Sequence, residues 1–233
     1  TGSVGNDLLV MTKEKYTTDT TLNGGEGTDT LALLGTGDFT ASEKLSGFEK
    51  LALVDISDSS VEGSFKIENA SNFTGITEFI TTNSLTIGGL ENNTEISVVN
   101  FMAYNVALDL TAKAANSAVT LNVAMTDHFL MHPESLTGGE VIDHSRAVLT
   151  NADNITQLTL TGKDVNATIL TTAALEDLRG HSIDVSGYVG DIQYESGWTY
   201  NDSEHTLTQN GISVTLNGVQ SDTTVSGGDP YPS

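Results

Sequence analysis

The stretch Asn23-Gly-Gly-Glu-Gly-Thr-Asp-Thr-Leu-Ala32 carries the most specific pattern in the chain. It matches the nonapeptide G-G-x-G-x-D-x-U-x, with U apolar, which is typical of parallel β-helices that bind calcium. Gly25 and Gly27 permit backbone conformations that turn peptide carbonyls toward an ion, and Asp29 adds an anionic oxygen. Because calcium takes about six to eight oxygen ligands, the stretch predicts a calcium site. An ordinary glycine-rich turn closed by an aspartate cap is the alternative.

Flanking residues extend this prediction. The amino end, Gly2-Ser-Val-Gly-Asn-Asp-Leu-Leu9, is a decayed copy in which Asp7 aligns with Asp29 and Leu9 with Leu31. Asp19 resembles the tail of a further repeat, although it precedes Asp29 by ten residues rather than nine. The predicted metal ligands are Asp29, Gly25, Gly27, Asn23, Asp19 and Asp7.

At this point the chain resembles the repeats-in-toxin (RTX) proteins, which leave the cell by type I secretion. The segment Leu45-Ser-Gly-Phe-Glu-Lys-Leu-Ala-Leu53 and the Thr/Asn-rich sequence after it are similar to RTX-type bacterial surface-layer (S-layer) proteins in particular. This resemblance implies calcium held between successive turns, export of an unfolded chain and folding outside the cell. It also implies a secreted protein at the bacterial surface.

Short β-favouring runs separated by Gly, Asn, Asp or Ser follow each other along the rest of the chain. Several alternate apolar and polar residues, as half-buried strands do, and they return at intervals of roughly 15–25 residues, as solenoid coils do. The predicted fold is all-β, a right-handed β-solenoid or β-roll-like domain over 1–225 whose RTX-like calcium-binding start covers about 1–35. A β-sandwich is the alternative. We expect strands at 30–34, 50–55, 64–67, 77–82, 84–87, 95–101, 105–110, 118–123, 147–150, 157–161, 166–170, 182–185, 205–209 and 212–216.

A few local signals interrupt or link these strands. Asn210-Gly211 predicts a type I′ turn between two strands, because both positions of that turn need positive φ. Short helices are expected at 172–180, with Thr172 as N-cap and Gly180 after the end, and at 40–45 and 126–136. The proline-containing tail 226–233 is predicted to be linker-like.

Composition excludes several classes of protein. The 31 acidic and 9 basic residues give a net charge of −22, so the surface repels nucleic acid. No apolar run has the roughly 18 residues that a membrane-spanning helix needs. The chain has no cysteine, which excludes disulfides and thiol chemistry.

Other clusters of polar residues give weaker predictions. His128, His132 and His144 could bind a transition metal, but the H-E-x-x-H pattern is absent, and a polar loop is the preferred interpretation. Asp55 with Asp58, and Asp191 with Glu195, are expected to be solvated surface rather than cation sites. No nucleophile elbow, P-loop or dinucleotide motif occurs, so we expect no enzyme activity. A glycan-active β-helix enzyme stays as an alternative.

The expected function is that of a structural module in an S-layer or related cell-surface protein, with calcium as cofactor and neighbouring subunits as partners. Strand 118–123 carries few charges and is predicted to be an edge strand that joins subunits. The main alternative is a calcium-dependent adhesin domain that binds glycan or peptide.

Overall fold

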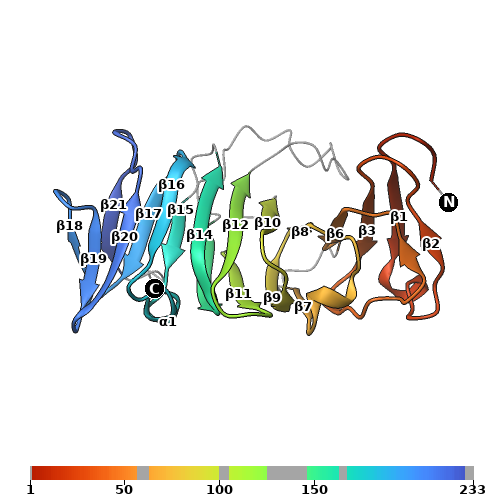
Figure 1. The fold of residues 1–233 in the computed structure, drawn as a ribbon, viewed down its shortest axis with the longest axis horizontal. Coiled ribbons are helices and arrows are strands. Elements are labelled where there is room, and N and C mark those ends of the chain that lie inside the picture. Colours follow the sequence, from red (N-terminus) through yellow and green to blue (C-terminus); the bar gives the residue numbers. More distant parts are fainter. Residues whose placement is uncertain (1, 57–62, 100–104, 125–145, 163–166, 229–233) are drawn as a thin grey trace.

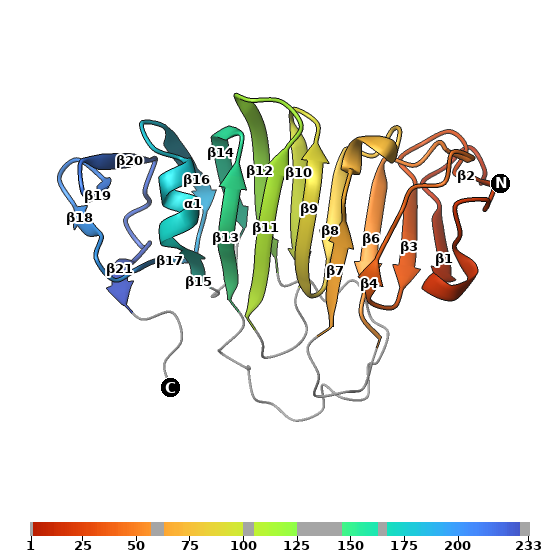
Figure 2. The same ribbon diagram turned by 90° about the horizontal axis from the view of Figure 1, so that it is seen from below.

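The computed structural model describes residues 2–56, 63–99, 105–124, 146–162 and 167–228. Within these residues the protein is all-β, and its strands form two large sheets and one two-stranded pair. The strands lie side by side along the long axis of the molecule, with the N-terminus at one end (Figure 1). From β6 to β17, consecutive strands alternate between the two large sheets, which is visible from the second direction (Figure 2).

The 11-stranded sheet contains, in spatial order, β1 (Leu8–Thr12), β3 (Thr30–Leu34), β6 (Lys50–Val54), β8 (Glu78–Thr81), β10 (Thr94–Val99), β12 (Ser117–Ala124), β14 (Ile155–Gly162), β16 (Ser182–Tyr188), β20 (Ile212–Asn217), β19 (Thr206–Gln209) and β18 (Thr199–Asn201). The 8-stranded sheet contains β21 (Val225–Gly228), β17 (Asp191–Glu195), β15 (Ala167–Leu170), β13 (Ala147–Asp153), β11 (Val106–Ala112), β9 (Ser84–Leu90), β7 (Ser64–Ile67) and β4 (Gly37–Asp38). The small pair is β2 (Leu22–Asn23) with β5 (Leu45–Ser46).

Nearly all strand pairs are parallel; the two antiparallel pairs among the described strands join β18, β19 and β20. Parallel register brings equivalent residues of successive strands into rows. One inward row of the 11-stranded sheet consists of Leu9, Leu31, Leu51, Phe79, Ile96, Leu121 and Leu160. A facing row consists of Phe65, Leu85, Leu108, Leu149, Leu170 and Tyr194.

These rows meet between the sheets in one core cluster that runs from Tyr16 to Leu216. In β11, buried and half-buried residues alternate along the whole strand, because successive side chains of a strand point to opposite faces. Burial of each Leu or Ile side chain contributes roughly 1.5–3 kcal/mol. Apolar alternation therefore selects both the strand and the face that it buries.

Several sequence predictions match the structure. The hairpin is confirmed: β19 and β20 pair antiparallel around Asn210 and Gly211, whose φ values are 50° and 81°. The predicted helix is confirmed as α1 (Thr172–Asp177), but its N-cap is Thr171, whose Oγ1 accepts the Ala174 N–H. Two 3₁₀ turns, η1 (Lys13–Lys15) and η2 (Ala70–Asn72), are the other described helical elements.

Other predictions are wrong. Residues 40–45 form no helix, because Ser42 Oγ donates to the carbonyls of Thr18 and Thr20 and fixes a turn. Strand 118–123 is no edge, since β12 lies between β10 and β14. The expected tail begins too early: residues 226–228 belong to β21, which pairs with β17. The predicted helix at 126–136 and the three histidines lie outside the described residues.

Candidate metal site in the stacked turns

The amino ends of the first strands bring three acidic residues into one row. Register pairs Leu8 with Thr30 and Thr30 with Lys50, so the residues just before them, Asp7, Asp29 and Glu49, occupy equivalent positions. The same register confirms the alignment of Leu9 with Leu31 that the sequence predicts. Three successive turns therefore place a carboxylate at the start of a parallel strand.

The carboxylates connect these turns through backbone donors. Asp29 Oδ1 accepts the N–H of Asp7 at 2.8 Å, and Glu49 Oε2 accepts the N–H of Asp29 at 2.8 Å. The Asp29 carbonyl in turn accepts the N–H groups of Glu49 and Lys50, each at 3.1 Å. The side chains of Asp29 and Glu49 thus each connect their own turn to the preceding one.

Asp29 differs from its two neighbours in its burial. Its relative exposure is 0%, whereas Asp7 and Glu49 are half-buried. No group in the described part of the chain donates to its second oxygen, Oδ2, which is itself buried. A buried acceptor without a partner costs about 1–3 kcal/mol, and more when it is charged. This oxygen is therefore suited to a cation.

Close contact between the turns depends on glycine. A Cβ on Gly24 would lie 2.7 Å from Asp29 Oδ2 and would overlap the carbonyl oxygen of Gly47. A Cβ on Gly2 would lie 2.7 Å from Asp7 Oδ2 and would overlap the carbonyl oxygen of Gly24. The turns are thus stacked so tightly that peptide carbonyls and carboxylates of adjacent turns lie close together.

The two other glycines predicted as ligands lie in the same turn. Gly25 and Gly27 have φ values of 110° and 131°, a region that residues with a Cβ rarely adopt. A Cβ on Gly25 would overlap the carbonyl oxygen of Ser3, and one on Gly27 would lie 2.7 Å from that of Gly5. The turn before Asp29 therefore packs its backbone directly on the turn before Asp7.

The remaining predicted ligands have different positions. Asp7 Oδ2 accepts the Ser3 N–H at 2.5 Å and the Ser3 hydroxyl at 3.0 Å. Asn23 is exposed on β2, and its carbonyl accepts the Gly2 N–H at 2.7 Å. The side chain of Asp19 is 93% exposed and lies 3.7 Å from Lys44 Nζ. The structure thus brings Asp29, Gly25, Gly27 and Asp7 together and leaves Asp19 at the surface.

The sequence motif missed Glu49, which belongs to the same row. Gly47 precedes it with a φ of 62°, and the apolar strand β6 follows it. The signal for Glu49 is therefore a glycine two residues before an acid and a strand, as in the segment Gly27-Thr-Asp29. No group of three or more His, Cys, Asp or Glu side chains suited to a metal occurs within the described ranges. An ion beside Asp29 would therefore take several peptide carbonyls as ligands, which calcium accepts.

A second polar group lies on the outer face of the 11-stranded sheet. Lys50 Nζ contacts Glu78 Oε2 at 2.6 Å, and Ser97 Oγ donates to Glu78 Oε1 at 2.7 Å. Burial, and then the nearby charge of Glu78, raise the pKa of Glu95 above its ordinary value. Because Lys50, Glu78 and Glu95 occupy paired register positions on three neighbouring strands, they form one polar row across this face.

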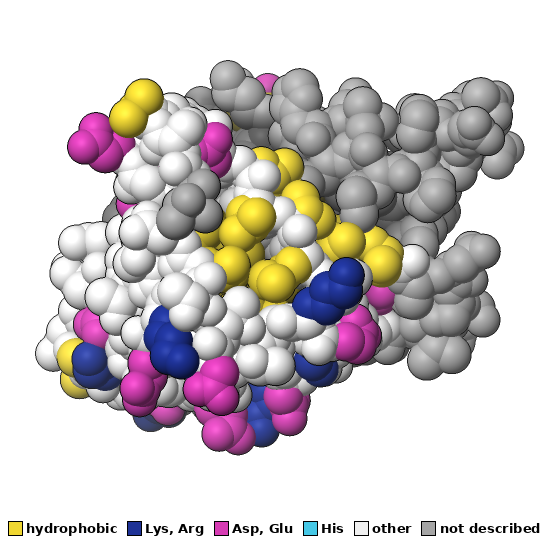
Figure 3. Space-filling model, turned by 90° about the vertical axis from the view of Figure 1, so that its right-hand side faces the viewer, with side chains coloured by type: hydrophobic (Ala, Val, Ile, Leu, Met, Phe, Trp, Pro, Cys, Tyr) yellow, Lys and Arg dark blue, Asp and Glu magenta, His cyan; other side chains and the backbone are white. Residues whose placement is uncertain are grey.

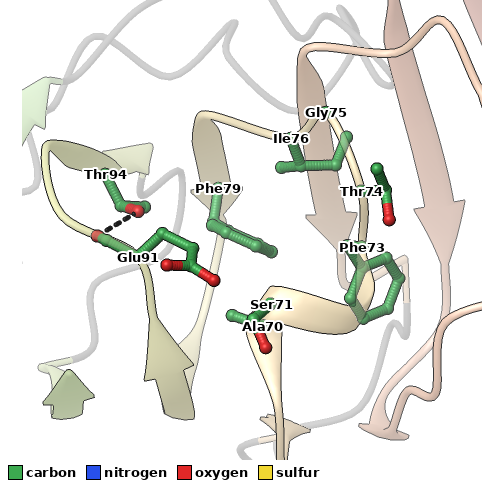
Figure 4. A pocket seen from close by; sticks show the side chains of 9 residues that line it. All are labelled: Ala70, Ser71, Phe73, Thr74, Gly75, Ile76, Phe79, Glu91 and Thr94. Carbon is green, nitrogen blue, oxygen red and sulfur yellow. Dashed lines mark hydrogen bonds between the residues drawn. The ribbon is translucent and has the colours of Figure 1, made fainter. Parts of the chain in front are cut away.

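A shallow hollow of about 200 Å³ lies beside η2. Phe73 and Phe79 form part of its wall, with ring centroids 6.3 Å apart, and Glu91 extends its carboxylate toward Phe79 (Figure 4). Glu91 also contacts Lys113 Nζ at 2.6 Å. Because ligand pockets usually measure roughly 300–1,000 Å³, the hollow is small for anything beyond one sugar ring or side chain.

Comparisons of the chain with protein-family models, with curated proteins and with solved structures give no match. Among the helices of the described segments, none has the length and apolar character needed to cross a membrane. The stacked turns around Asp29 therefore carry the functional argument by their geometry alone.

Proposed function

We propose that this chain is a structural module of a secreted, calcium-dependent bacterial S-layer or cell-surface protein. Calcium would bind in the stacked turns of the N-terminal part, at about residues 1–35, and neighbouring modules would assemble into an extracellular lattice. The observation that supports this most strongly is the buried Oδ2 of Asp29, which has no donor in the described chain. A hard divalent cation satisfies such an oxygen, and the glycine turns supply carbonyls beside it.

The finer architecture that fits this role is a right-handed β-solenoid. Consecutive strands alternate between two sheets and pair in parallel with strands two positions along the chain. A sandwich of Greek keys would instead pair strands antiparallel. A solenoid becomes longer by adding coils that contact only their neighbours. This architecture suits an extended structural protein better than a protein that encloses a substrate.

Charge explains why such a scaffold would need calcium. A net charge of −22 repels itself and opposes both folding and the approach of other subunits. Calcium lowers that repulsion where the turns are most closely packed. Its binding energy then becomes folding energy, because the ligands come together only in the folded chain. Folding outside the cell, where calcium is abundant, follows from this coupling.

The test is thermal unfolding of the purified chain in chelator and in calcium, with Asp29→Asn and Asp19→Asn compared. Calcium at about 100 times its Kd stabilises a folded protein by about 2.7 kcal/mol, which corresponds to a rise of about 5–10 °C in Tm. We expect this rise for the unmodified chain and for Asp19→Asn, and its loss for Asp29→Asn. Asn keeps the shape and the Oδ1 acceptor of Asp29, but it replaces the anionic Oδ2 with an amide NH2 group, which donates hydrogen bonds and does not bind a cation.

Two outcomes would contradict the proposal. If the unmodified chain melts at the same temperature in chelator and in calcium, the turns are ordinary capped turns. If Asp29→Asn and Asp19→Asn respond to calcium equally, the ion binds elsewhere. Magnesium serves as the control for general charge screening, because it demands a smaller and more regular ligand shell.

A calcium-dependent adhesin domain is the second candidate, supported by the hollow beside Phe73 and Phe79. An adhesin would bind a soluble glycan or peptide saturably as a monomer. A lattice module would ignore soluble sugars and assemble instead. Calorimetry with small glycans, followed by light scattering on the same sample, separates these functions; conversion of a polymer would instead indicate the less favoured glycan-active enzyme.

A further inference from the structure

Three consecutive turns of the N-terminal part are stacked in register. Residues 2–7, 24–29 and 47–49 form a first, second and third turn, each directly before a strand of the 11-stranded sheet. The N–H groups of Gly2 and Gly24 each donate to the backbone carbonyl just before the next turn, at 2.7 Å and 3.0 Å. The third turn is half as long as the other two and lacks the nonapeptide pattern.

Each junction between two of these turns holds a carboxylate oxygen beside a peptide carbonyl. At the first junction, a Cβ on Gly2 would lie 2.7 Å from Asp7 Oδ2 and would overlap the carbonyl oxygen of Gly24. At the second junction, a Cβ on Gly24 would lie 2.7 Å from Asp29 Oδ2 and would overlap the carbonyl oxygen of Gly47. Because both oxygens of a junction lie close to one point, a single cation can contact both of them.

The two junctions differ in what their carboxylate oxygens already bind. Asp7 is half-buried, and its Oδ2 accepts both the N–H and the hydroxyl of Ser3, at 2.5 Å and 3.0 Å. Asp29 is 0% exposed, and no group in the described chain donates to its Oδ2. A buried anionic oxygen without a partner is costly. The second junction is therefore the one that a cation would stabilise most.

No basic side chain neutralises this row of carboxylates. On the N-terminal end, seen in Figure 3, basic side chains lie beside Asp and Glu side chains along the lower border of the face. Among the salt bridges of the described residues, however, none includes Asp7, Asp29 or Glu49. A bound cation would supply the positive charge that these three acids lack.

We propose that one calcium ion binds at the second junction, between the second and third turns, and that the first junction binds none. Asp29 Oδ2 and the carbonyl oxygen of Gly47 would be ligands. Glu49 would be a positioning residue, because its carboxylate accepts the N–H of Asp29 at 2.8 Å.

The inference rests on the calcium site of the proposed function and goes beyond it in two ways. It assigns a ligand to a turn that lacks the nonapeptide pattern, and it extends the site from about residue 35 to Glu49. Calcium would then connect the glycine-rich turns directly to strand β6, which lies in the core.

The test is a calorimetric titration of the purified, chelator-treated chain with calcium, which gives the number of ions and their Kd. Asp29→Asn and Asp7→Asn are matched variants, since each replaces the carboxylate of one junction with an amide. We expect one ion for the unmodified chain and an unchanged Kd for Asp7→Asn. For Asp29→Asn we expect a Kd at least about tenfold higher, because even the loss of a group that orients a ligand costs about 10–100-fold in metal affinity.

A second pair of variants tests the role of Glu49. Glu49→Ala removes the acceptor of the Asp29 N–H and should raise the Kd for calcium about tenfold. Glu49→Gln keeps an amide oxygen that can accept this N–H and should restore most of the affinity. Equal weakening by both variants would contradict the positioning role, because it would mean that the charge of Glu49 acts on the ion directly.

Two results would overturn the inference and leave the proposed function in place: two bound ions per chain, or calcium binding that Asp7→Asn weakens as much as Asp29→Asn does. A chain that binds no calcium would overturn both proposals. Circular dichroism in chelator shows whether each variant is folded. If Asp29→Asn does not fold, the number of ions and the Kd of Asp7→Asn decide between the junctions.

Discussion

The 11-stranded sheet ends differently at the two ends of the molecule. At the C-terminal end the chain reverses: β19 and β18 add to β20 in antiparallel order. Leu207 and Val214 are 0% exposed there, and Trp198 donates its indole N–H to Thr172 Oγ1 at 3.3 Å. At the N-terminal end the parallel order simply stops at β1, and Leu9 and Met11 stay partly exposed.

The difference shows that the parallel pairing of strands does not by itself cover the last strand of a sheet. Each layer buries its inward side chains against the next layer, so the last layer needs either a cap or a partner. The C-terminal hairpin acts as a cap and lets the acidic surface face water. The N-terminal end has tightly stacked turns, and Leu9 and Met11 of its first described strand are only partly buried.

The largest expected effect comes from the same substitution made at each end. Leu207→Ala leaves a cavity under the hairpin and should lower the free energy of unfolding by about 2–5 kcal/mol. Leu9→Ala occupies the inward row of β1 and should cost less than half as much, because its side chain is already partly in water. Urea unfolding in chelator, at a concentration where the protein is monomeric, measures both; equal losses would mean that the N-terminal end is covered.

A smaller effect is expected where glycines hold the turns together. Gly24→Ala would press its Cβ into the carbonyl of Gly47 and should cost about 1–3 kcal/mol, as overpacking does. Gly228→Ala, at the end of β21, meets no atom within 4 Å and should leave stability nearly unchanged. The same unfolding measurement serves for both. Similar stabilities would show that the turns of the N-terminal end are less tightly stacked than the structure indicates.

The smallest change in stability is expected for a substitution in the central strand β10, which serves as a reference for the two ends of the molecule. Burial, and then the nearby charge of Glu78, raise the pKa of Glu95 in the folded chain, so the folded chain holds a proton on this carboxyl more strongly than the unfolded chain does. Stability from this group is fully present below the pKa of the unfolded chain and is lost as pH rises through the raised value. Glu95→Gln should therefore raise Tm at pH 7, and the difference should vanish below about pH 4. Glu204→Gln, exposed near the C-terminal end, is the control, and a Glu95→Gln protein that gains nothing at pH 7 contradicts the burial of this carboxyl.

The sequence predicted those parts of the fold that depend on local alternation or local turn geometry. Strand β14, with alternating Leu and Thr, and the turn at Asn210-Gly211 are examples, and so is the alignment of Asp7 with Asp29. Alternation does not show which strand pairs with which, so the central strand β12 was predicted to be an edge. Strand β17 was missed because Asp191 and Glu195 resemble a solvated loop, although Ile192 is buried in the facing sheet.

In the candidate site, too, the sequence predicted the residues of the local turn motif and missed those that depend on contacts between turns. The glycines and Asp29 follow from a nine-residue pattern, because that pattern encodes the turn itself. Glu49 does not follow from it, since its longer side chain reaches the Asp29 N–H from a turn with a single glycine. Asp19 is exposed at the surface, where its charged neighbour is Lys44, which is far from it in sequence. Contacts between layers therefore decide which acids belong to the site.

The direction of the strand pairing has a mechanical consequence. Backbone hydrogen bonds between neighbouring strands run along the long axis of the molecule, because the strands lie side by side along it (Figure 1). Tension along that axis acts on the hydrogen bonds of each pair of neighbouring strands in series, so the weakest pair separates first. Shear across the axis loads many hydrogen bonds of one pair at the same time. The molecule should therefore resist a force across its long axis better than a force along it.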